Sequence, residues 1–92
     1  MHEEWLEKLA KKLEIIELKE TKNSITCTFS PEMSKRIDVE EFFVEACKIT
    51  RMFRFQFTSN CLILVLDTIK LEKHPIYYLL LLLNKIKYKD ET

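Results

Sequence analysis

Residues 52–66 read MFRFQFTSNCLILVL, two short β-prone runs separated by the pair Ser59-Asn60. In the first run every second residue is a phenylalanine, which predicts a strand with its aromatic rings on one face. The run from Cys61 to Leu66 is apolar on both faces, as is typical of a strand that is covered on two sides. A two-residue connection favours an antiparallel hairpin, although the glycine preferred at such turns is missing. This stretch therefore predicts a β-hairpin whose second strand is buried.

A helix precedes this hairpin and begins after Asp38. Asp38 can cap a helix, and Glu41 three residues later completes a pattern like a capping box. Ile37 before the cap and Phe42 inside the helix can form a hydrophobic staple. The apolar face of the helix comprises Val39, Phe42, Phe43, Ala46, Cys47 and Ile49. We expect Phe42, together with Phe55 of the following strand, to be largely buried.

A polar connection over residues 67–74 leads to a last helix, which we expect to run from Pro75 to about Tyr88. Proline suits the first turn of a helix because its missing N–H would be unpaired there. The helix is apolar in every direction around its axis, whereas a terminal helix of a small domain normally has one wet face. It is therefore either buried on two sides by this domain or part of a docking surface, with Tyr78 and Leu82 as candidate contacts.

The N-terminal part of the chain has a similar layout. Residues 3–13 show helical spacing of their apolar side chains, and residues 15–20 and 24–30 predict two strands around a hairpin loop at 21–23. The apolar positions of the helix are Trp5, Leu6, Leu9, Ala10 and Leu13. Two apolar residues share one face of the first strand, Ile16 and Leu18. Three residues of the second strand are expected to point inward, namely Ile25, Cys27 and Phe29.

Pro31 ends the second strand, because proline cannot donate to a sheet ladder, and residues 31–37 are expected to form a loop. Together these patterns predict a single α+β domain over residues 1–92. The expected order of elements is α-β-β-α-β-β-α, in which two antiparallel hairpins pack with three helices.

Composition argues against several classes of function. Fifteen basic and fifteen acidic side chains cancel, whereas proteins that bind duplex nucleic acid concentrate positive charge. The chain contains no glycine, so it has neither a P-loop nor a GxGxxG loop for phosphates. Three cysteines without CxxC spacing indicate a reducing compartment instead of a disulfide framework, and no apolar run is long enough to cross a bilayer. We expect a cytoplasmic protein with no cofactor, no metal and no membrane partner.

Catalytic patterns are also missing from the sequence. His74 is better explained as a cap or loop residue than as a general base, because no nucleophile can be placed beside it. Cys27 and Cys47 fall on inward faces, where free cysteine behaves as a small hydrophobe. The glutamates of the middle helix suit its N-terminal end and its solvated face. The domain is therefore expected to have no catalytic site and no small-molecule substrate.

Three segments carry a resemblance to a known family: residues 9–15 (LAKKLEI), 25–30 (ITCTFS) and 37–42 (IDVEEF). They resemble the C-terminal domain of the bacterial transcription-repair coupling factor (Mfd), in which "LAKKLGI" is followed by a strand ending in "FS" and by "VDPEKLI" opening a helix. Order and spacing agree over roughly residues 5–66, and a long final helix also matches. Two positions depart from the family pattern: Glu14 stands for its glycine and Val39 for its proline.

The resemblance implies that this chain is the C-terminal regulatory domain of a larger helicase-like protein. The family's parent protein is an ATP-dependent DNA translocase that displaces stalled RNA polymerase and recruits excision-repair proteins. In that family the C-terminal domain packs on a module similar to the repair protein UvrB and masks the surface that recruits UvrA. No catalytic residue of the family lies in this domain, which is consistent with the missing glycine loops here.

A masking domain needs polar side chains for a contact that can be released. Outward charges are expected on the first helix, at Glu7, Lys8 and Lys11, and around the third strand, at Arg51 and Arg54. Two other functions remain open. The aromatic strand beside these arginines could bind nucleic acid, although such rows of rings more often belong to a core. The last helix could also serve as the dimer interface of a small scaffold protein.

Overall fold

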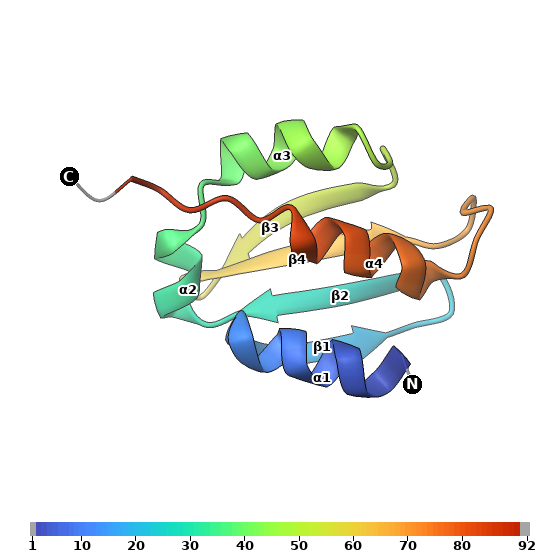
Figure 1. Ribbon diagram of the computed structural model, residues 1–92, viewed down its shortest axis with the longest axis horizontal. Coiled ribbons are helices and arrows are strands. Elements are labelled where there is room, and N and C mark those ends of the chain that lie inside the picture. Colours follow the sequence, from blue (N-terminus) through green and yellow to red (C-terminus); the bar gives the residue numbers. More distant parts are fainter. Residues whose placement is uncertain (1, 91–92) are drawn as a thin grey trace.

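A four-stranded antiparallel sheet forms the framework of the domain (Figure 1). The structure is a computed structural model, which describes residues 2–90. Its helices are α1 (His2–Lys12), α2 (Pro31–Arg36), α3 (Val39–Cys47) and α4 (Pro75–Asn84). Its strands are β1 (Ile15–Glu20), β2 (Ser24–Phe29), β3 (Phe53–Thr58) and β4 (Cys61–Asp67). The predicted α+β class and both predicted hairpins are confirmed.

Strands β2 and β4 join the two hairpins, so that the order across the sheet is β1-β2-β4-β3. Their pairing runs from Ser24 opposite Asp67 to Thr28 opposite Ile63. This order makes β1 and β3 the edge strands and leaves β4 with a neighbour on each side. Most of β4 is buried, in agreement with its apolar sequence.

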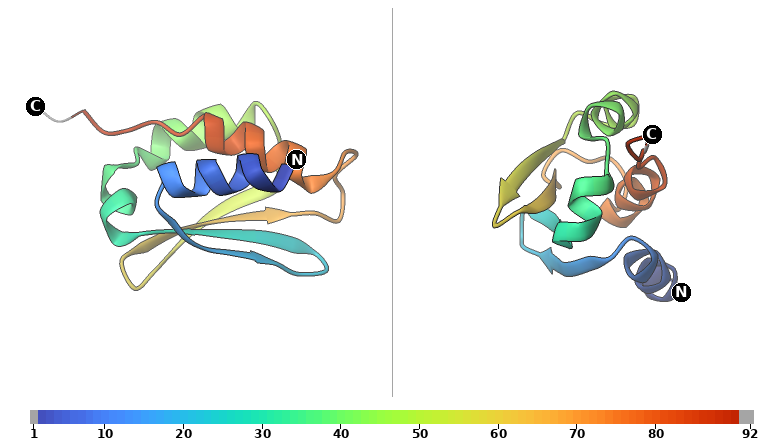
Figure 2. Two further views of the ribbon diagram at one scale, coloured as in Figure 1. Left: turned by 60° about the horizontal axis from the view of Figure 1, so that its bottom comes forward. Right: turned by 90° about the vertical axis from the view of Figure 1, so that its left-hand side faces the viewer.

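The three longer helices lie over one face of the sheet, with α4 between α1 and α3, while α2 closes one end (Figure 2). The inward residues of β2 are buried as predicted, and Cys27 lies opposite Leu64 of β4 at the centre of this covered face. On the other face Thr26 lies opposite Val65, and none of the four helices in residues 2–90 covers that face (Figure 2). The apolar character of both faces of β4 therefore reflects its central place in the sheet, because neighbouring side chains shield Val65.

Helix α2 occupies a segment where the sequence predicts a loop. Pro31 ends β2 as expected, but it also stands in the first turn of this helix, where its missing N–H costs nothing. The Ser30 side chain caps the helix and accepts a hydrogen bond from the Met33 backbone N–H at 3.1 Å. Met33 is buried, so α2 adds to the core. The correct order of elements is therefore α-β-β-α-α-β-β-α.

Helix α4 ends at Asn84, four residues before the predicted end. The segment that follows is extended and pairs with the connection between α2 and α3. Asp38 donates its backbone N–H to the Lys87 carbonyl at 2.7 Å, and Lys89 donates to the Arg36 carbonyl at 2.8 Å. Asp38 still caps α3 as predicted, since its carboxylate accepts from the Glu41 N–H at 3.1 Å. Tyr88 therefore forms an isolated antiparallel β-bridge with Ile37 instead of belonging to a helical turn.

Several apolar residues are more exposed than their patterns predict. The side chains of Ile16 and Leu18 lie on the edge strand β1, which has an irregularity between Ile15 and Glu17, and both are exposed. Phe42 is fully buried, but Phe55 is only half-buried and its neighbour Phe57 is exposed. Edge strands have a partner on one side only, so alternation alone does not decide how deeply their side chains are buried.

Glu14, between α1 and β1, has φ of 52°, in the left-handed region that favours glycine. We expect Glu14→Gly to be more stable than Glu14→Ala by about 1 kcal/mol, because only alanine keeps the Cβ that strains this conformation. The alanine variant is the matched control, since both substitutions remove the glutamate side chain. Urea unfolding measures the difference. Equal stabilities of the two variants would show that the left-handed conformation at position 14 does not destabilise a residue that has a Cβ.

Candidate docking surface

Three hollows in the described part of the chain are lined by residues of α1. A groove of about 240 Å³ lies between α1 and α4, and we call it the α1–α4 groove; its lining residues are Trp5, Lys8, Leu9, Lys12 and Asn84. The α1–β1 groove is lined by Leu6, Glu7, Ala10 and Leu18. A third hollow, the outer hollow, is lined by Glu4, Glu7, Lys8 and Lys11. Helix α1 thus contributes to three adjoining depressions.

Helix α1 has these hollows because it is only partly packed on the domain. Leu13, just beyond its end, is buried, but Leu6 and Leu9 are half-buried. Trp5 is 57% exposed, although helical spacing places it among the apolar positions. A large exposed indole is unusual on a protein surface and is common at the centre of protein interfaces. These features together make the α1 side the best candidate for a docking surface.

The charged residues predicted for the first helix lie together on this surface. Glu7, Lys8 and Lys11 are exposed and line the outer hollow, and Lys11 lies one helical turn after the other two. Their charges are of both signs, which suits polar contacts with another protein domain more than contact with a phosphate backbone.

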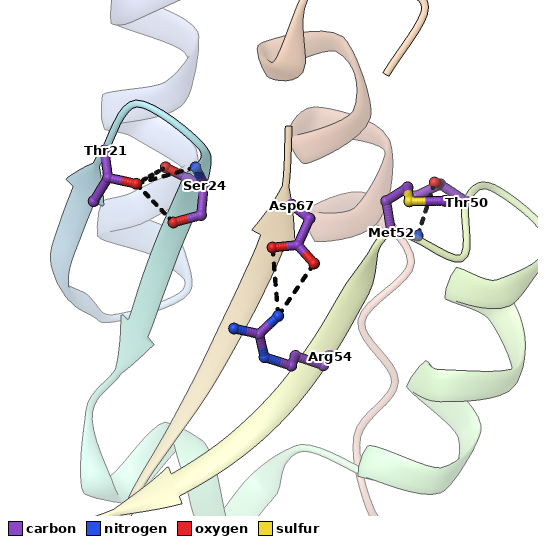
Figure 3. Close-up of polar contacts among 6 residues, drawn as sticks. All are labelled: Thr21, Ser24, Thr50, Met52, Arg54 and Asp67. Carbon is purple, nitrogen blue, oxygen red and sulfur yellow. Dashed lines mark hydrogen bonds and ion pairs between the residues drawn. The ribbon is translucent and has the colours of Figure 1, made fainter. Parts of the chain in front are cut away.

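The two predicted arginines lie elsewhere. Arg54 extends from β3 on the uncovered face of the sheet, where its guanidinium pairs with the Asp67 carboxylate at 3.2 Å (Figure 3). Arg51 is exposed in the connection between α3 and β3. The other polar contact on the β1–β2 hairpin in this close-up, between the Thr21 and Ser24 hydroxyls, joins residues of one turn. The structure therefore does not bring the arginines together with the charges of α1.

Helix α4 is covered mainly by this domain. Leu82 is 0% exposed and belongs to the core, so it is wrong as a docking residue. Tyr78 is half-buried, packs against the core and lies edge-on to Tyr77 at 5.5 Å between ring centroids. The reading in which α4 is buried on two sides is favoured, because α1 and α3 flank it (Figure 1).

The aromatic strand faces α3. Rings of Phe53 and Phe55 lie 5.5 Å apart, and Phe42 and Phe43 of α3 lie within 5.6 Å of one or the other. Phe53 is buried and Phe55 half-buried by these contacts with α3, which favours a core role for both rings over base stacking. Phe57 is the exposed member of the row.

Polar groups that could carry chemistry have structural partners. His74 caps α4 and accepts a hydrogen bond through Nδ1 from the Ile76 N–H at 3.2 Å. Burial raises the pKa of the Cys27 thiol to about 12, so this group stays neutral at physiological pH. Within residues 2–90, no cluster of histidine, cysteine and carboxylate side chains is placed to hold a metal ion.

Of the residues that line these hollows, only Glu7, Lys8 and Lys11 are predicted from the sequence as docking residues. Those not predicted include Trp5, Lys12, Leu18 and Asn84. Their exposure depends on how α1 sits relative to β1 and α4, which local spacing does not specify. The one available signal is the tryptophan itself, since it is the only one in the chain.

Comparisons with family models, curated proteins and solved structures found no match for this chain. Among the described residues, no helix has the length and apolar character needed to cross a membrane.

Proposed function

We propose that this chain is a non-catalytic regulatory domain of a transcription-repair coupling factor. It docks on the UvrB-like module of the same protein and masks the surface that recruits UvrA. As the C-terminal domain of an ATP-dependent DNA translocase, it works in the cytoplasm and needs no cofactor. The observation that carries the proposal is the α1 surface, where an exposed tryptophan and apolar grooves lie among charges of both signs.

Local geometry at three positions is compatible with the family resemblance. Glu14 stands where the family has glycine, and its φ of 52° is the conformation that glycine favours. Ser30, the last residue of the strand motif, caps α2, and Asp38, in the third motif, caps α3. Both caps use the residue types that terminate helices in general. The positive φ at Glu14 is the feature that supports the proposal here, because it explains why a related sequence would have glycine at this position.

The α1 surface suits a contact that must open. Contacts between domains that move are modest in area and more polar than permanent interfaces. The grooves of α1 provide apolar contact, while Glu7, Lys8 and Lys11 provide charge pairs that solvent can replace. A change of a few kcal/mol in such a contact moves a two-state clamp from mostly closed to mostly open.

In the full-length parent, deletion of residues 1–92 is expected to raise the affinity for UvrA roughly tenfold or more, because masking ends. Lys8→Glu combined with Lys11→Glu should give part of this increase, since the reversed charges weaken the docked state. Surface plasmon resonance with immobilised UvrA measures both effects.

Arg51→Glu combined with Arg54→Glu is the matched control, because it makes the same change in net charge away from α1. We expect it to leave the UvrA affinity near that of the wild type. A larger effect from the arginine pair than from the lysine pair would place the docking surface on the β3 side. Unchanged affinity after the deletion would refute masking itself.

A further inference from the structure

We propose that the α1–α4 groove binds an acidic protein segment that inserts an apolar side chain between Lys8 and Lys12. This inference rests on the proposed function, in that it names the chemistry of the partner at the same surface. The occupant is a peptide segment with a leucine or a similar residue flanked by aspartate or glutamate. Apolar contact in the groove and charge at its rim together define this partner.

The apolar part of the groove is formed by Trp5 and Leu9. Leu9 is half-buried and packs against the core, so it provides a fixed wall, while Trp5 is exposed beside it. The volume of about 240 Å³ is below the roughly 300 Å³ at which small-molecule pockets begin. The groove is therefore better suited to one apolar side chain of a protein than to an enclosed metabolite.

The charged part of the groove is positive. Lys8 and Lys12 are one helical turn apart, so both ammonium groups reach the same side of α1, and Asn84 adds an amide from α4. Among the residues that the structure describes, no carboxylate lines this groove. Over the part of the chain that the structure describes, neither lysine makes an ion pair, because the pairs found there involve other residues. A partner with carboxylates thus meets two cations that are not held in an ion pair by any described residue, although Glu4 and Glu7 line the next hollow with Lys8.

The neighbouring hollows restrict where such a segment can lie. Glu7 lines both the α1–β1 groove and the outer hollow, and Glu4 lines the outer hollow as well. In the outer hollow they balance Lys8 and Lys11, so that this hollow attracts an acidic segment less than the α1–α4 groove, whose charged lining residues are Lys8 and Lys12. Nucleic acid is a poorer occupant, because two lysines in a chain with balanced charge neutralise few phosphates.

Trp5 provides the measurement, since it is the only tryptophan in the chain and lines the groove. The probe is an acetylated and amidated peptide of sequence DELLDEL, compared with the peptide KKLLKKL. The acidic peptide is expected to shift the tryptophan emission to shorter wavelength in a saturable way and to bind at least tenfold more tightly than the basic one. High salt should weaken the binding, because the contact is partly ionic.

Lys8→Glu combined with Lys12→Glu is expected to weaken binding of the acidic peptide tenfold or more, because attraction becomes repulsion at both positions. The control is Lys19→Glu with Lys22→Glu, which changes the net charge equally but lies on the β1–β2 hairpin, and it should change the dissociation constant less than twofold. Circular dichroism confirms that each variant is folded.

Any of the following results would overturn the proposal: no saturable shift at millimolar peptide, equal binding of both peptides, or equal loss in the two double variants. A single-stranded oligonucleotide that binds more tightly than the acidic peptide, and loses binding in the Lys8 and Lys12 variant, would also overturn it. If the peptide binds as expected while deletion in the parent leaves UvrA affinity unchanged, masking fails and the groove assignment stands.

Discussion

Phe42→Ala is expected to bring the domain close to unfolding, with a loss of about 3–5 kcal/mol. Phe42 is 0% exposed, and its ring centroid lies 5.1 Å from that of Phe55, so the substitution leaves a cavity between α3 and β3. Domains of this size have a total stability of about 5–10 kcal/mol. Thermal unfolding followed by circular dichroism should therefore show a large fall in Tm or no folded baseline.

Phe43→Ala is the matched control, because it removes the same side chain from the next position of α3. Phe43 is 49% exposed, although its ring lies 5.6 Å from that of Phe53. We expect it to lose well under half as much stability, since water already contacts much of the ring. A Tm close to that of the wild type for Phe42→Ala would mean that α3 presents a different face to the sheet.

Ser34→Ala is expected to have the second-largest effect, about 1–3 kcal/mol. The buried Ser34 hydroxyl donates to the Ser30 carbonyl at 2.7 Å and accepts from the Leu62 backbone N–H at 2.7 Å. It therefore joins α2 to β4, and its removal leaves a buried N–H without a partner. Urea unfolding with an unchanged m-value measures this loss.

Ser24→Ala is the control that tests whether burial of the hydroxyl explains the loss of stability expected for Ser34→Ala. The Ser24 hydroxyl lies 2.8 Å from that of Thr21 in an exposed hairpin turn (Figure 3), where water can replace the lost contact. We expect a change within about 0.5 kcal/mol. Equal losses for Ser24→Ala and Ser34→Ala would refute the role assigned to the Leu62 hydrogen bond.

Local patterns predict the hairpins and the cap of α3 because their signals are contained within a few residues. Alternation defines β2 and β3, and Asp38 marks the start of α3. Helix α2 cannot be predicted from the sequence pattern, because its six residues are too few to show a helical period. It also begins at Pro31, which the pattern uses to end a strand. The pairing of β2 with β4 is equally hidden, because no local signal says which strands of two hairpins meet.

The residues of the candidate surface also differ in whether the sequence alone can predict their exposure. Glu7, Lys8 and Lys11 can be placed on an exposed helix face because charged side chains stay in water wherever the helix packs. Leu82 cannot be assigned from sequence, because α4 is apolar all around and any side could face the core. The exposure of Trp5 cannot be predicted for a different reason. Its spacing places it among the apolar positions of α1, but α4 covers only part of that apolar face.

The pairing of β2 with β4 also has a consequence for the rate of folding. Each hairpin closes over a short connection, at 21–23 and at 59–60, and such hairpins form within microseconds. The β2–β4 ladder pairs residues far apart in the sequence, such as Ser24 and Asp67. It forms more slowly, because closing such a long loop costs more entropy. The transition state for folding is therefore expected to be the docking of two preformed hairpins. Substitutions at the β2–β4 seam, such as Cys27→Ala, should slow folding, whereas those on the outer edge of β1 should mainly speed unfolding.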